Sequence, residues 1–137
     1  MIYTVDIPGK PVPWARPRKG RRGRWFNTPH SEAHRAVLGT LLRAARIPPF
    51  VGAVRVDMDF VFRRQRKGEN PDVWLLRSVR PDADNLAKLV LEALEDVGIV
   101  EDDKQCHIGG AWRWYGCWRE EPFTRVRLQA VDRRSAP

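Results

Sequence analysis

Four acidic residues and one lysine in the middle of the chain have the types and spacing of a metal-dependent catalytic site. Asp82 and Asp84 are separated by one residue, Lys88 follows Asp84 by four residues, and Asp102 and Asp103 form a second acidic pair. Carboxylates brought together repel one another, by roughly 1 kcal/mol at 4 Å in water, and a hard cation such as Mg²⁺ removes this cost. Bound magnesium activates water and neutralises phosphate, so the set favours phosphodiester hydrolysis.

The same acids also have a plainer interpretation. Asp82 and Asp84 begin a predicted helix, where acidic side chains cap backbone N–H groups and favour the helix dipole. Asp102 and Asp103, taken alone, are typical of a solvated turn. Residue types and spacing therefore leave the structural and the catalytic interpretation open.

Charge is unevenly distributed along the chain, whose net charge is +8. Residues 1–50 hold ten Lys or Arg and two Asp or Glu, whereas residues 82–103 hold eight carboxylates and one lysine. A basic region of this kind indicates a polyanionic partner, and an acidic patch indicates a bound cation. The residues expected to contact DNA phosphates belong to one basic loop, residues 16–24: Arg16, Arg18, Lys19, Arg21, Arg22 and Arg24. Trp25 and Phe26 follow this loop and either stack on an unpaired base or pack into the core.

Two helices are expected to position these residues. Residues 82–97 carry a single apolar stripe with helical spacing, made of Leu86, Leu89, Val90, Ala93, Leu94 and Val97. A second helix is expected over residues 29–46, with Thr28 as its N-cap and Pro29 at its first position. Its inward face is predicted to hold Ala33, Val37, Leu41, Ala44 and Ala45.

Strands are expected over residues 1–8, 51–63 and 74–76, and residues 106–115 and 123–131 are expected to form a closing hairpin. Apolar and polar residues alternate over 51–63, which predicts a half-buried strand. Residues 9–28 and 64–80 are interpreted as loops and 132–137 as a frayed tail. The expected fold class is α+β, a single domain over 1–137 with a mixed, mostly antiparallel sheet and two main helices.

Several classes of protein are excluded by what the sequence contains. The longest apolar runs are far shorter than the roughly 20 residues that a membrane span needs, and the N-terminus is not typical of a signal peptide. Two cysteines are too few for a disulfide scaffold. We therefore expect a cytoplasmic protein without a membrane partner.

The acidic motif resembles the signature of the RusA family of Holliday junction resolvases. Residues 80–94 read RPDADNLAKLVLEAL and residues 98–105 read GIVEDDKQ. The family pattern is Pro-Asp-x-Asp-Asn-x-x-Lys, an apolar helix, and then Asp-Asp-x-Gln. The segments GKPVP at 9–13 and RPR at 16–18 are similar to the N-terminal loop of the family, and the resemblance covers roughly residues 5–110. Glu92 stands where the family commonly has aspartate, and the 64–80 loop is longer than in compact members.

The resemblance implies a small homodimer, often encoded on prophages, that uses Mg²⁺, with Mn²⁺ as a substitute, to cleave branched DNA. It assigns metal binding to Asp82, Asp84 and Asp103, with Asp102 a weaker candidate, and a supporting catalytic role to Lys88. Two symmetric nicks in a four-way junction need two sites, which a two-fold dimer provides. Two other hypotheses remain: a non-catalytic DNA-binding protein on the same scaffold, and a nuclease for flaps or other branched DNA.

Overall fold

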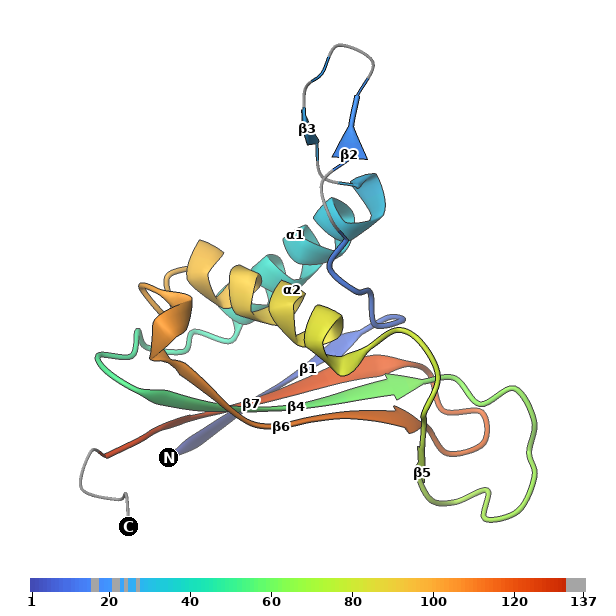
Figure 1. The fold of residues 1–137 in the computed structure, drawn as a ribbon. Helices are drawn as coiled ribbons and strands as arrows, with labels where there is room; N and C mark the ends of the chain where they lie inside the picture. Colours follow the sequence, from blue (N-terminus) through green and yellow to red (C-terminus); the bar gives the residue numbers. More distant parts are fainter. Residues whose placement is uncertain (16–17, 21–22, 24, 27, 133–137) are drawn as a thin grey trace.

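The computed structural model describes residues 1–15, 18–20, 23, 25–26 and 28–132 of the 137-residue chain. Two helices lie over one face of a five-stranded sheet in a single small α+β domain (Figure 1). The fold class predicted from the sequence is confirmed. The expectations of DNA contact for Arg16, Arg21, Arg22 and Arg24 and of a frayed tail for 133–137 fall outside the described residues.

The sheet is mixed and mostly antiparallel. Its strands lie in the order β1 (Ile2–Pro8), β7 (Phe123–Ala130), β4 (Val54–Phe62), β6 (Cys106–Tyr115) and β5 (Leu75–Leu76). The β4–β6 pair is parallel and the other three pairs are antiparallel. A separate antiparallel pair, β2 (Arg18–Lys19) with β3 (Trp25–Phe26), interrupts the loop expected over 9–28.

The expected hairpin of residues 106–115 and 123–131 is wrong, because β4 lies between β6 and β7. The helix before β6 returns the chain across the sheet, so β6 pairs in parallel with β4. The chain then crosses the end of β4, where Gly116 N–H donates to the Phe62 carbonyl at 2.8 Å. This crossing lets β7 pair with the other side of β4.

The prediction that β4 is half-buried fails for its second half, where every residue from Met58 to Phe62 is buried. Neighbours on both sides make β4 a central strand, and side chains of those neighbours cover its outer face. Asp59 on that face is only 6% exposed, and it accepts a hydrogen bond from Trp114 Nε1 at 2.9 Å and pairs with Arg127 at 3.0 Å. An alternating sequence therefore marks the two faces of this strand but not which of them is exposed.

Helix α1 (Pro29–Ala44) forms where expected, but a different face is buried. Ala33, Val37, Ala44 and Ala45 are exposed and Leu41 is half-buried, whereas the buried residues are Ser31, Leu38, Gly39 and Leu42. Burial of a leucine stabilises a fold far more than burial of an alanine, so the leucines set the orientation of the helix. Thr28 occupies the N-cap position, but its hydroxyl donates to Ser31 Oγ at 2.9 Å and makes no capping bond.

Helix α2 (Ala83–Asp96) confirms the strongest element predicted from the sequence. It ends before Gly98, whose φ of 75° suits a residue just past a helix end. A 3-10 turn, η1 (Asp103–Gln105), then leads into β6. The predicted stripe faces the sheet, and its buried members are Leu86, Leu89, Val90, Ala93 and Leu94.

The polar loop that follows β4 is organised by one buried cation. Arg64 is 7% exposed, and its guanidinium donates only to backbone carbonyls. The acceptors are Gly116 at 3.0 Å, Lys67 at 3.1 Å, Glu69 at 3.4 Å, Asn70 at 3.1 Å and Val73 at 2.6 Å. A buried charge with this many acceptors fixes the path of the loop at one end of the sheet.

Candidate functional site

The acids at the N-terminal end of α2 have free carboxylates. Asp82 is the N-cap residue and Asp84 lies in the first turn, and both are exposed. Asp82 makes no side-chain capping bond, and no described residue forms a hydrogen bond or ion pair with either carboxylate. The preceding segment is fixed to β6, because Arg113 Nη1 donates to the carbonyls of Val79 at 2.9 Å and Pro81 at 3.3 Å. Capping alone therefore does not account for these two acids.

Lys88 lies one turn further along α2 and rests on an aromatic ring. Its ammonium nitrogen is 3.5 Å from the ring centre of Trp14, a distance typical of a cation–π interaction. Trp14 is half-buried against the core, and its backbone N–H donates to the Asn85 carbonyl at 2.8 Å. The N-terminal loop thus packs on the first turns of α2 and orients Lys88. Sequence reasoning missed Trp14, because a contact between residues 74 positions apart leaves no local pattern.

The second acidic pair begins the η1 turn, where Asp102 has a structural role. Its carboxylate accepts from Lys104 N–H at 2.8 Å, and Gln105 Oε1 accepts from Asp102 N–H at 3.2 Å, which completes a capping box. The hydrogen bond from Lys104 N–H, followed by one with the Asp103 side chain, lowers the pKa of Asp102. Asp102 is therefore engaged locally, as expected for the weaker metal candidate, whereas Asp103 is an exposed neighbour.

The two acidic groups lie at opposite ends of α2 within one chain (Figure 1). The helix has 14 residues, and at 1.5 Å per residue its ends are about 20 Å apart. Consistent with this separation, no group of three His, Cys, Asp or Glu side chains within the described ranges could hold a metal ion. The fold thus places Asp82, Asp84 and Lys88 together and does not bring Asp103 to them in the same chain.

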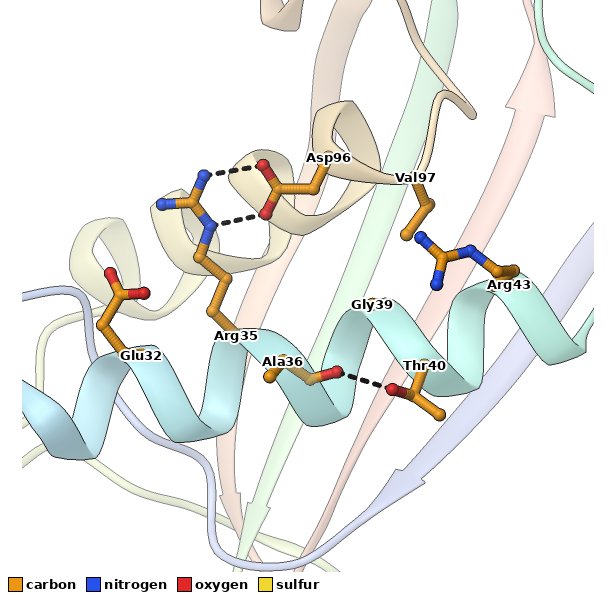
Figure 2. A pocket seen from close by; sticks show the side chains of 8 residues that line it. All are labelled: Glu32, Arg35, Ala36, Gly39, Thr40, Arg43, Asp96 and Val97. Carbon is orange, nitrogen blue, oxygen red and sulfur yellow. Dashed lines mark hydrogen bonds and ion pairs between the residues drawn. The ribbon is translucent and has the colours of Figure 1, made fainter.

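A hollow of about 510 Å³ lies along α1 and the C-terminal end of α2 (Figure 2). Its main charged groups pair with each other, since Arg35 donates to both Asp96 oxygens, at 2.5 and 2.7 Å, and to Glu92 at 3.2 Å. The hydrogen bond from Arg35 lowers the pKa of Asp96, whereas burial raises the pKa of Glu92 despite the same partner. We interpret this hollow as the contact between the two helices, because its cation is already neutralised.

The basic loop is described only in part. Lys19 is exposed in the short β2–β3 pair, and the backbone of Arg18 lies beside it. The arrangement agrees with an accessible cationic hairpin above the helices (Figure 1). DNA contact by this loop remains a prediction.

The comparison with protein families decides between the interpretations of this chain. The family model described as Endodeoxyribonuclease RusA matches residues 8–129, which include the N-terminal loop, α2, η1 and both acidic groups. The chain belongs to the RusA family of endodeoxyribonucleases. Members of the RusA family act on Holliday junction DNA, so nuclease chemistry on branched DNA is the function that the family implies.

Two further findings complete the comparison for this RusA-family chain. A search of curated proteins gave no match. Among the helices of the described part of the chain, none is long and apolar enough to cross a membrane.

Proposed function

We propose that this RusA-family chain is a magnesium-dependent, structure-selective endonuclease that resolves four-way DNA junctions by paired symmetric nicks. The observation that carries the proposal is the pair of unengaged carboxylates at the start of α2, with Lys88 one turn away. These residues fall inside the family match. The site presents the groups that phosphodiester hydrolysis requires, namely oxygen ligands for a cation and an ammonium for developing negative charge.

The donor set at the start of α2 fits a magnesium ion. Asp82 and Asp84 offer exposed carboxylate oxygens, which are the ligands that Mg²⁺ and its substitute Mn²⁺ take. When bound, the ion would supply an activated water and neutralise the phosphate. Lys88, held over the Trp14 ring, would stabilise the charge that builds up on the phosphate oxygens.

A complete site needs a second copy of the chain if Asp103 is also a ligand. Carboxylate oxygens lie about 2 Å from magnesium, whereas Asp103 and Asp84 are separated by the length of α2. A two-fold axis near the middle of α2 would bring the N-terminal end of one helix close to Asp103 of the partner. It would do so twice, which creates two equivalent sites. We therefore propose a homodimer in which each metal site is shared between the two chains.

Two rival functions make different predictions. A non-catalytic DNA-binding protein would bind a junction without cutting it, and a flap nuclease would cut flaps faster than junctions. The free carboxylates beside Lys88 favour catalysis over binding alone. No feature of the described residues favours flaps over junctions, so cleavage rates must separate these two.

The direct test is cleavage of labelled four-way junctions, flaps and duplexes of matched sequence, with Mg²⁺ or with EDTA. We expect symmetric cuts in the junction that depend on Mg²⁺ and are fastest on that substrate. Asp84→Asn is the matched control, since it keeps the size of the side chain and removes its charge. It should bind the junction and leave it intact. Junction binding without cleavage by the wild-type protein would support the non-catalytic rival.

A further inference from the structure

A cavity of about 340 Å³ lies at the end of the sheet where the chain approaches α2. It opens where β4 and β6 end at Phe62 and Tyr115 and where β7 begins, and the segment after β5 contributes Arg77. The remaining lining residues are Lys10, Arg63, Gln65, Glu121 and Pro122. The catalytic proposal above uses none of these side chains.

Arg77 has hydrogen-bond donors that nothing in the described chain satisfies. Its guanidinium carbon lies 3.9 Å from the ring centre of Phe62 and 5.7 Å from that of Tyr115. Nε and Nη1 are covered from solvent, and no described residue accepts a hydrogen bond from either atom. Stacking on a ring face satisfies the charge in part but leaves the in-plane N–H groups without acceptors. Unpaired covered donors are rare in folded proteins and often indicate a bound anion or ligand.

The charge of the cavity wall fits an anion. Three cations, Lys10, Arg63 and Arg77, face one carboxylate, Glu121, which leaves a net charge of +2. Glu121 lies 3.8 Å from Arg63 with both side chains well exposed, so this weak ion pair does not neutralise Arg77. A stacked guanidinium is also well suited to phosphate, because its planar donors match the oxygen atoms of that group.

The cavity also lies within reach of the proposed catalytic acids. Arg77 precedes Asp82 by five residues, and five residues of extended chain span at most roughly 18 Å. One DNA strand rises about 3.4 Å per nucleotide, so a phosphate at Arg77 would lie within about five nucleotides of a phosphate at Asp82. A single strand can thus occupy both places.

We propose that this cavity is a phosphate-binding subsite, in which Arg77 holds a backbone phosphodiester of the DNA strand a few nucleotides from the one that is cut. The proposal rests on the proposed nuclease function for its ligand. The phosphate supplies the acceptors that Nε and Nη1 lack, after a small shift of the guanidinium. The subsite is separate from the basic loop 16–24 and fixes the position of the strand along the protein.

Two measurements test the subsite. The first follows the Arg77 Nε–Hε resonance by NMR during titration with inorganic phosphate and, separately, with a short single-stranded DNA. Arg77→Gln assigns the signal. We expect both titrants to shift it, the DNA at lower concentration. A response to inorganic phosphate alone, without any response to DNA, would overturn the proposal, and so would an unmoved signal with both.

The second measures junction affinity against salt in the Asp84→Asn background, where no cleavage interferes. Arg77→Gln should weaken binding roughly tenfold and lower the salt slope by about one. Arg77→Lys should restore part of the affinity but less of the specificity of orientation. Arg43→Gln is the matched control, since it removes one exposed cation near the other end of the sheet, where α1 ends.

The outcomes of the two proposals can be told apart. Equal salt slopes for Arg77→Gln and Arg43→Gln would refute the subsite and leave cleavage of junctions untouched. A wild-type protein that fails to cleave but still shows the Arg77-dependent slope would refute the nuclease function and retain the phosphate subsite. Thermal unfolding of each variant verifies that the fold is intact.

Discussion

The contact between Lys88 and Trp14 predicts an energetic coupling between the helix and the N-terminal loop. Replacing Trp14 by leucine keeps an apolar side chain against the core but removes the ring beneath the ammonium. Because Lys88 is exposed, the cation–π interaction should stabilise the contact by about 0.5–1 kcal/mol. If the same contact holds Lys88 in the reaction, its loss should slow cleavage by about two- to five-fold.

The coupling is measured with a double-mutant cycle of Trp14→Leu and Lys88→Met. Urea unfolding of the four proteins gives the interaction free energy, from which the loss of apolar packing cancels. Single-turnover cleavage of a junction at saturating protein gives the effect on the chemical step, and Trp14→Phe should retain most of the wild-type rate. A coupling near zero, or a Trp14→Phe rate as low as that of Trp14→Leu, would refute the reasoning.

Three other predictions follow from single contacts. Arg35→Gln should destabilise the fold at neutral pH by about 0.5–1 kcal/mol, a small value because solvent screens the pair with Asp96. The pKa of Asp96 is lowered in the folded state, so this stabilisation is present above its ordinary value of 3.8, and urea unfolding should show the difference shrinking as the pH falls below it. Arg64→Met leaves buried carbonyls without their donor, which should cost roughly 2–3 kcal/mol and expose the following loop to limited proteolysis. Replacing Arg21 and Arg22 by alanine should lower the salt slope of junction binding by about two, and an unchanged slope would remove the basic loop from the DNA contact.

The helix that carries the acids could be predicted from the sequence because its pattern is local and strong. Leu86, Leu89 and Leu94 repeat with helical spacing and are all buried in the structure. The helix α1 could be located but not oriented, since small apolar residues such as Ala33 lie on its exposed side. Local periodicity states that a face is apolar, and only the packing partners decide which face is covered.

The order of the strands could not be predicted, because it depends on contacts between distant residues. The segments 106–115 and 123–131 follow each other in the sequence, yet β4 separates them in the sheet. The roles of Arg64 and Arg77 were equally invisible, since the carbonyls and rings around them come from several loops and strands. The RusA signature, by contrast, could be read directly, because its acids and lysine keep a fixed register along one helix.

The central claim is that Asp84 of one chain and Asp103 of its partner serve the same metal site. It is tested by mixing Asp84→Asn and Asp103→Asn proteins, each inactive alone, after subunit exchange shown by co-purification of two tags. Random exchange makes about half of the dimers mixed, each with one intact site, so nicking should return at about a quarter of the wild-type density of sites. A mixture that exchanges subunits and binds junctions but stays inactive would contradict the shared site.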